Sequence, residues 1–185
     1  MKCVPVTRQA DPPKRILIYG EHGAGKGVLA SKIAAKAGPA LWLDLEAGNR
    51  LNFNDGDYQY PAFGEPWDVD AVHENMETPP PPGVASIILD NATVYSNAVL
   101  CSRFTNAKGF TDIQGFSRAM DARLSDWFSR PINVIILARG AWRDGAVRLD
   151  CPPVWAHMVD TVIRAYRDGQ SYGYVEEKAR KPWRK

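Results

Sequence analysis

The chain has 185 residues, of which 45% are hydrophobic and 24% are charged, with a formal net charge of +2. These values are typical of a folded globular protein, so they exclude a fibrous repeat and disorder along the whole chain. No apolar stretch suits a signal peptide or a membrane span, so we expect a cytosolic protein. The cysteines and histidines are dispersed, which predicts neither a disulfide framework nor a metal centre. The length predicts one domain over 1–185.

An N-terminal arm is expected at 1–13, and the first predicted element is a strand at 15–19. The apolar run RILIY indicates this strand, because it stops at a glycine. A helix is predicted next, since GVLASKIAAKA has helical spacing and the Gly-Pro pair at 38–39 ends it. The run ALWLD at 40–44 predicts a second strand. Together these segments form a βαβ unit.

The middle of the chain predicts a short strand at 58–63 and an acidic helix at 67–76. The prolines of TPPPP at 78–82 exclude a helix interior or a central strand. The apolar run VASIIL at 84–89 then ends at Asp90, which is typical of a strand buried on both faces of a parallel sheet.

Two helices are predicted next, at 93–104 and 112–128, followed by a buried strand at 132–138. One face of the second helix is expected to carry Ile113, Phe116, Met120, Leu124 and Trp127. The segment 141–149 predicts a hairpin, because Asp-Gly at 144–145 favours a type I′ turn.

The C-terminal part predicts antiparallel strands. Residues 159–166 alternate in hydrophobicity and are expected to pair with 173–175 across a turn at 168–169. Residues 176–185 are predicted to form a basic tail. The predicted fold class is therefore α/β, a mostly parallel sheet flanked by helices, with antiparallel strands at the C-terminal end.

Residues 20–27 read GEHGAGKG and match the phosphate-binding loop G-x-x-x-x-G-K-[ST] except at the last letter. Glycines let backbone N–H groups turn toward phosphates at a helix N-terminus, and Lys26 then reaches the β- and γ-phosphates. Gly27 replaces the hydroxyl that holds magnesium, so turnover is expected to be weakened. The predicted nucleotide-binding residues are Gly20, Glu21, His22, Gly23, Ala24, Gly25, Lys26, Gly27 and Val28.

Two carboxylates are candidates for the chemistry that such a loop serves. Asp90 ends a predicted buried strand, where it can contact magnesium, although an aspartate there is often only a helix cap. Glu46 follows the second strand and is the candidate that orients the attacking water, with Asp44 as its competitor and an ordinary loop acid as the alternative.

Four segments together resemble a known family: ILIYGEHGAGKGVLASKIA, LWLDLEAGN, SIILDNAT and NVIILAR. In this order they resemble the RecA-like P-loop ATPase core of phage proteins in the Sak-type single-strand-annealing group, which is related to RecA recombinases. The resemblance implies a RecA-like, AAA-like NTPase that uses ATP and Mg²⁺, acts on single-stranded DNA in recombination or repair, and assembles into oligomers. For a phage-encoded protein it implies the host cell cytoplasm.

The resemblance also implies roles for individual residues. Glu46 matches the catalytic carboxylate, Asp90 matches the aspartate that contacts magnesium through water, and Thr93 matches a hydroxyl that follows it. Arg139 stands where the family has a His or Gln sensor. Lys178 is a candidate for reaching the nucleotide of a neighbouring subunit.

Arg180 shares that candidate trans-acting role with Lys178. The alternative for both is a solvated basic tail, in a half of the chain where 15 Lys and Arg face 9 Asp and Glu over 101–185. Trp183, among basic residues, is a candidate for stacking on a single-stranded base.

Two other function classes stay open from the sequence. A small-molecule kinase that phosphorylates a nucleoside or nucleotide also uses a phosphate-binding loop, and the hairpin with Arg143 and Arg148 could serve as its lid. A degenerate module that binds nucleotide without turnover is favoured by Gly27 and Arg139.

Overall fold

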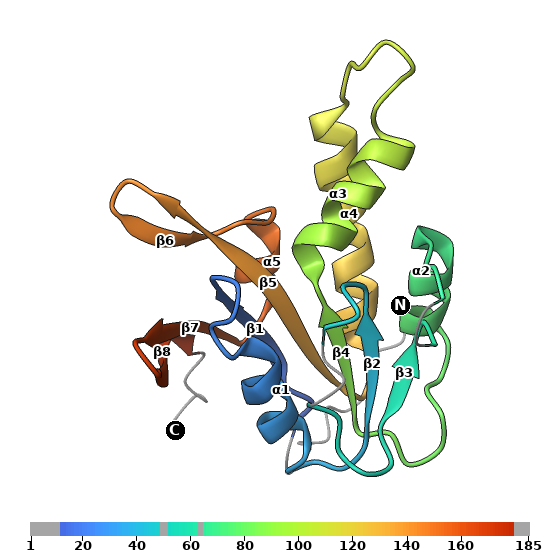
Figure 1. Ribbon diagram of the computed structural model, residues 1–185. Helices are drawn as coiled ribbons and strands as arrows, with labels where there is room; N and C mark the ends of the chain where they lie inside the picture. Colours follow the sequence, from blue (N-terminus) through green and yellow to red (C-terminus); the bar gives the residue numbers. More distant parts are fainter. Residues whose placement is uncertain (1–11, 49–51, 63–64, 180–185) are drawn as a thin grey trace, which may run out of the picture.

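The computed structural model describes residues 12–48, 52–62 and 65–179, and its central feature is one eight-stranded sheet (Figure 1). The strand order is β3-β2-β4-β5-β1-β7-β8, and β6 extends the sheet by pairing with β5. The strands are β1 (Arg15–Gly20), β2 (Ala40–Asp44), β3 (Tyr58–Tyr60), β4 (Ser86–Asp90), β5 (Asn133–Arg143), β6 (Ala146–Leu149), β7 (Thr161–Asp168) and β8 (Ser171–Ala179). In the order of the sheet, the six strands β3, β2, β4, β5, β1 and β7 are parallel to their neighbours. The strands β6 and β8 are antiparallel to β5 and β7, respectively.

The central strands are buried on both faces. Every residue of β1, β2 and β4 is buried, as expected for parallel strands covered by helices on both sides. Because successive side chains of a strand point to opposite faces, Leu17 and Ile18 enter two separate hydrophobic clusters. The continuous apolar runs in the sequence are therefore explained by the burial of β1, β2 and β4 between two layers of helices.

Within the described ranges, five helices cover the two faces of the sheet unequally. They are α1 (Lys26–Ala34), α2 (Val69–Glu77), α3 (Ala92–Arg103), α4 (Ile113–Ser129) and α5 (Val154–Met158). On one face Ala30 and Ala34 of α1 pack with Ile18 and Trp42. The other face is covered by residues of α2, α3, α4 and α5, among them the fully buried Trp155.

The predicted fold class is confirmed, and so is the hairpin between β5 and β6. Asp144 and Gly145 have φ values of 53° and 74°, the positive pair that a type I′ turn requires. The predicted pairing of the last two strands is also observed, with Tyr166 opposite Gly173.

Three expectations need correction. Ile113 is 61% exposed, because it is the first residue of α4 and precedes Phe116, the first buried residue of the helix. The short helix α5 was not predicted, since five residues after two prolines give too little periodicity. The strand β8 continues through Ala179, so residues 176–179 belong to the sheet and not to a tail.

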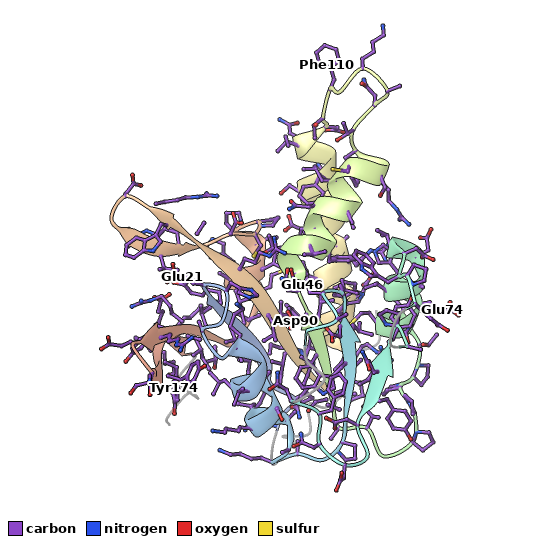
Figure 2. The ribbon with its side chains drawn as sticks, viewed as in Figure 1. Glu21, Glu46, Glu74, Asp90, Phe110 and Tyr174 are labelled. Carbon is purple, nitrogen blue, oxygen red and sulfur yellow. The ribbon has the colours of Figure 1, made fainter. Side chains whose placement is uncertain are left out.

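Two parts of the chain project away from the sheet (Figure 1). One is the pair α3 and α4, whose connecting loop carries Phe110, 72% exposed (Figure 2). The other is the hairpin of β5 and β6, where Trp142 is 65% exposed. Over the described ranges, no helix has the length and apolar character needed to cross a membrane.

Candidate functional site

The loop between β1 and α1 has the conformation that its glycines allow. Gly23 and Gly25 have φ values of 72° and 79°, a region that residues with a side chain rarely adopt. The Nζ atom of Lys26 turns back over the loop and donates hydrogen bonds to the carbonyl oxygens of Gly20 (3.1 Å) and Glu21 (2.9 Å). The loop therefore leads into α1 with the ammonium of Lys26 turned back over the first residues of the loop.

The register of the sheet brings the other candidates beside this loop. Asp44 is opposite Asp90 in the pairing of β2 with β4, and Gly20 is opposite Arg139 in the pairing of β1 with β5. Since these strands are parallel, their carboxyl ends meet at one edge of the sheet. That edge is where ligands bind in open α/β folds.

The electrostatic environment of Lys26 reflects this convergence. Burial lowers the pKa of Lys26, and the negative charges of Asp90 and Glu46 partly oppose that effect, while Arg139 adds to it. One lysine, one arginine and two carboxylates thus interact across the same space.

Glu46 is held at both carboxylate oxygens. Its Oε1 forms an ion pair with the guanidinium of Arg139, and its Oε2 accepts a hydrogen bond from Nδ2 of Asn91 at 2.5 Å. Asn91 is fixed in turn because its Oδ1 accepts from the backbone N–H of Val94 (2.8 Å) and caps α3. Sequence reasoning missed Asn91, although its position directly after Asp90 and before a helix was a signal.

The competitor of Glu46 lies elsewhere. Asp44 is only 1% exposed, and its Oδ1 accepts a hydrogen bond from the backbone N–H of Gly48 (3.3 Å), which stabilises the turn after β2. Glu46 instead lines the cavity described below. The geometry therefore favours Glu46 over Asp44 as the carboxylate that faces a ligand.

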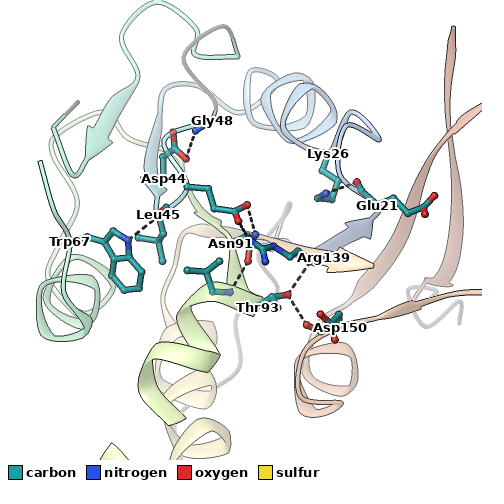
Figure 3. Close-up of polar contacts among 12 residues, drawn as sticks. Glu21, Lys26, Asp44, Leu45, Gly48, Trp67, Asn91, Thr93, Arg139 and Asp150 are labelled. Atoms are coloured by element: carbon teal, nitrogen blue, oxygen red, sulfur yellow. Dashed lines mark hydrogen bonds and ion pairs between the residues drawn. The ribbon is translucent and has the colours of Figure 1, made fainter. Parts of the chain in front are cut away.

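A network of hydrogen bonds ties Arg139 to the hairpin (Figure 3). The hydroxyl of Thr93 accepts from the backbone N–H of Arg139 (3.0 Å) and donates to the carbonyl of Asp150 (2.7 Å). The backbone N–H of Asp150 donates to the carbonyl of Arg139 (2.9 Å), and its carboxylate accepts from Arg143 (2.8 Å). Thr93 therefore fixes the backbone at Arg139, the last residue of β5 that is paired with β1.

The candidate ligand-binding residues line a cavity of about 1390 Å³. It is lined by the loop residues from His22 to Val28, by Glu46, Asp90 and Arg139, and by Tyr172 and Tyr174 of β8. Tyr172 lies over the loop, because a Cβ on Gly25 would be 3.0 Å from its Cδ1 atom. No feature of the sequence predicted this tyrosine, since its position depends on how β8 folds back on β7.

The donor set fits a magnesium ion that is bound mainly through phosphates and water. Asp90 ends β4 beside the loop and is 9% exposed. In the part of the chain that the structure describes, no three His, Cys, Asp or Glu side chains form a cage for a metal. Magnesium commonly needs only one or two protein carboxylates when a nucleotide supplies the remaining oxygens.

Lys178, one of the candidate trans-acting residues, does not line this cavity. Nζ of Lys178 donates hydrogen bonds to the carbonyl oxygens of Ala156 (2.7 Å) and His157 (2.9 Å), at the C-terminal end of α5. Arg180 and Trp183 lie outside the described residues.

The parallel sheet, its helices on both faces and the glycine loop between β1 and α1 define a RecA-like α/β fold. The solved structure titled "Crystal structure of the RadB recombinase" has this fold: it aligns with a TM-score of 0.60, covering 91% of this chain and 82% of that chain, at 15% sequence identity. No protein-family model and no curated protein matches the sequence. At this identity the similarity establishes the fold, and the finer resemblance to the phage Sak-type group stays a prediction.

Proposed function

We propose that this chain is an ATP-binding RecA-like ATPase that acts on single-stranded DNA in recombination or repair. The observation that carries the proposal is the convergence of one lysine, two carboxylates and one arginine on a single cavity, at the edge of the sheet where β1, β2 and β4 end and where the pairing of β5 with β1 ends. A solved recombinase with the same fold supports the biological setting.

The proposed roles follow from charge and position. The backbone N–H groups of the loop and the ammonium of Lys26 bind the phosphates, which requires Lys26 to exchange its two carbonyl partners for phosphate oxygens. Asp90 would hold Mg²⁺ through water, and the ion would supply positive charge beside the phosphate oxygens. Glu46 orients or deprotonates the attacking water.

Gly27 makes slow turnover part of the proposal. A hydroxyl at this position would bind the magnesium ion directly, whereas a water must replace it here. A single misplaced contact can lower a rate by about 100-fold. A module that binds nucleotide without turnover is therefore the second candidate function, and the engagement of both Glu46 oxygens also favours it.

The DNA-binding part of the proposal rests on exposed aromatic and basic side chains. Trp142 is 65% exposed and precedes Arg143 on the projecting β5–β6 hairpin, which also carries Arg148. Bases of single strands stack on exposed aromatic rings while arginines contact the phosphates. Trp142 is thus a described residue that suits the stacking role first assigned to Trp183.

The finer parts of the proposal are membership of the phage Sak-type group and assembly into oligomers. In such an assembly Lys178 and Arg180 would reach the nucleotide of the neighbouring subunit. Lys178 would have to leave its two carbonyl partners on α5 to do so.

Phosphate release from ATP, measured with and without single-stranded DNA, tests the proposed function. We expect slow release that the DNA accelerates and that Lys26→Ala abolishes. Release that survives Lys26→Ala contradicts the assigned site. Transfer of phosphate to a nucleoside in a substrate panel would indicate the kinase alternative, and nucleotide binding with no release would indicate the binding module.

A further inference from the structure

We propose that the chain pairs with a second copy of itself through β8, the last strand of the sheet, and forms a two-fold symmetric dimer with a continuous sheet. β8 is nine residues long and lies at the end of the sheet that is opposite β3 (Figure 1). In the part of the chain that the structure describes, β8 pairs only with β7. The inference does not depend on the proposed function, because self-pairing requires no nucleotide.

The first observation is that half of this edge lacks the features that usually prevent a strand from pairing with another chain. Edge strands are commonly very short, interrupted by a β-bulge or lined by charges. The other edge strand, β3, has only three residues. In β8, Glu177 is skipped in the register with β7, and residues 176–178 are all charged. The segment 171–175, SYGYV, has neither a bulge nor a charge.

The second observation concerns the backbone groups of this segment. A two-residue turn joins β7 to β8, with Asp168 opposite Ser171. The closing pair of such a hairpin exchanges both of its hydrogen bonds, and the pattern then alternates along the ladder. Residues 171, 173 and 175 therefore direct their N–H and C=O groups toward β7. The N–H and C=O groups of Tyr172 and Tyr174 point to the open edge.

These groups make the segment complementary to itself. When two copies pair in antiparallel fashion, Tyr172 of each copy can lie opposite the partner's Tyr174, and each of these pairs exchanges both of its hydrogen bonds. The two-fold axis then passes between Gly173 and the partner's Gly173. These two residues form a non-hydrogen-bonded pair, in which the Cα atoms approach to about 4.5 Å. Neither has a side chain that opposes this approach.

The third observation is that tyrosines are exposed on both faces of the segment. Tyr172 and Tyr174 are each 63% exposed on the face of the cavity. On the other face the ring of Tyr166 lies over Gly173, where a Cβ would be 2.4 Å from its Cζ atom, and Tyr166 is 41% exposed. In the dimer Tyr172 packs on the partner's Tyr174, and the two Tyr166 rings approach the axis. Cross-strand aromatic pairs stabilise sheets, and tyrosine is enriched at interfaces.

This dimer differs from the assembly that the family resemblance implies. There a residue of one subunit reaches the nucleotide of the next, which requires heterologous contacts that can continue from subunit to subunit. Pairing through β8 uses the same surface in both copies and therefore stops at two. Because Tyr172 and Tyr174 line the cavity beside the phosphate loop, the partner's strand would lie at the rim of that cavity.

Sedimentation equilibrium of the full chain over a range of protein concentrations, without nucleotide, tests the proposal. We expect a monomer–dimer equilibrium with no larger species. Tyr174→Lys should weaken dimerisation by at least about 10-fold, because it places two ammonium groups in the interface. Tyr58→Lys is the matched control: it introduces the same charge at an exposed tyrosine of the other edge strand, β3, and should leave dimerisation unchanged.

Disulfide cross-linking tests the register. The Cα atoms of a hydrogen-bonded pair lie about 5.5 Å apart, which suits a disulfide. When Tyr172→Cys and Tyr174→Cys proteins are mixed and oxidised, we expect a bond from position 172 of one copy to position 174 of the other, identified by the masses of the linked peptides. Each variant alone should link less, because its equivalent positions are diagonal neighbours about 7–8 Å apart.

Several results would overturn the proposal. One is a monomer at every concentration, and another is association that Tyr174→Lys leaves intact or that Tyr58→Lys weakens equally. A mass that rises beyond the dimer indicates head-to-tail assembly and also contradicts pairing through β8. If Tyr174→Lys does not fold, the mixed cross-link decides: its formation supports the dimer, and its absence overturns it.

Discussion

Gly20 and the carbonyl of Ala165 are in direct contact: a Cβ on Gly20 would lie 2.2 Å from the Ala165 oxygen. The first glycine of the phosphate loop is thus required by the packing of β1 against β7 as well as by the motif. The loop and the sheet depend on the same residue.

Gly20→Ala is therefore expected to destabilise the fold. The neighbouring atom is backbone and cannot move without disturbing β7, so we expect a loss of about 3 kcal/mol in the free energy of unfolding. Chemical denaturation measures it. Gly48→Ala is the control, since no heavy atom lies within 4 Å of a Cβ there. Equal losses in the two variants would contradict the steric explanation.

Gly27→Thr is expected to raise ATP hydrolysis by about 10-fold or more, because it restores a hydroxyl ligand for magnesium. Steady-state phosphate release at saturating ATP measures the change. An unchanged rate in Gly27→Thr, together with loss of activity in Lys26→Ala, would show that the missing ligand does not limit turnover.

Trp142→Ala is expected to weaken binding of single-stranded DNA by about 10-fold, which corresponds to the free energy lost when one base no longer stacks. Phosphate release in the absence of DNA is expected to stay unchanged. Fluorescence anisotropy with a labelled oligonucleotide measures the affinity. Tyr58→Ala serves for comparison, because Tyr58 is also exposed but lies on β3, at the edge of the sheet. A similar loss in both variants would point to a nonspecific effect.

Lys178→Met is expected to lower stability by about 1 kcal/mol, because Nζ of Lys178 satisfies two carbonyls at the end of α5. Thermal unfolding measures this loss. If the substitution abolishes ATP hydrolysis while the unfolding temperature is unchanged, Lys178 acts in a neighbouring subunit, as the family resemblance implies.

His73 is expected to make stability depend on pH. It is 6% exposed and contacts the hydroxyl of Tyr95, and burial, followed by the charges of Arg123 and Arg103, lowers its pKa from 6.5 to about 4. Below pH 6.5 the unfolded chain therefore binds a proton that the folded chain does not. Stability falls as the pH decreases from 6.5 toward 4, by an amount on the order of 2 kcal/mol.

Denaturation midpoints between pH 7.5 and 5 check this dependence. His73→Gln should remove the decrease in stability that the protonation of His73 causes below pH 6.5, whatever its effect on stability at neutral pH. His157→Gln is the control, because His157 is exposed. If the denaturation midpoint depends on pH in the same way in the unmodified protein and in His73→Gln, His73 is not the source of the pH dependence.

Much of the fold was predictable because its signals are local. The strands β1, β2 and β4 have continuous apolar runs, and Asp144-Gly145 selects its turn through the φ angles that each residue tolerates. The phosphate loop was predictable for the same reason, since its glycines and lysine act within one segment. Elements with weak local signals, such as α5, were missed.

The sequence by itself determined the type of loop, the type of fold and the positions of Glu46 and Asp90 at the ends of strands. Only the tertiary structure decided which groups meet. Arg139 and Glu46 are separated by 93 residues, and their ion pair exists because β5 lies between β4 and β1 in the sheet. Tyr172 covers Gly25 because β8 folds back beside the loop. Periodicity and turn chemistry act over a few residues, whereas these contacts depend on the strand order, which follows from the burial of all the elements together.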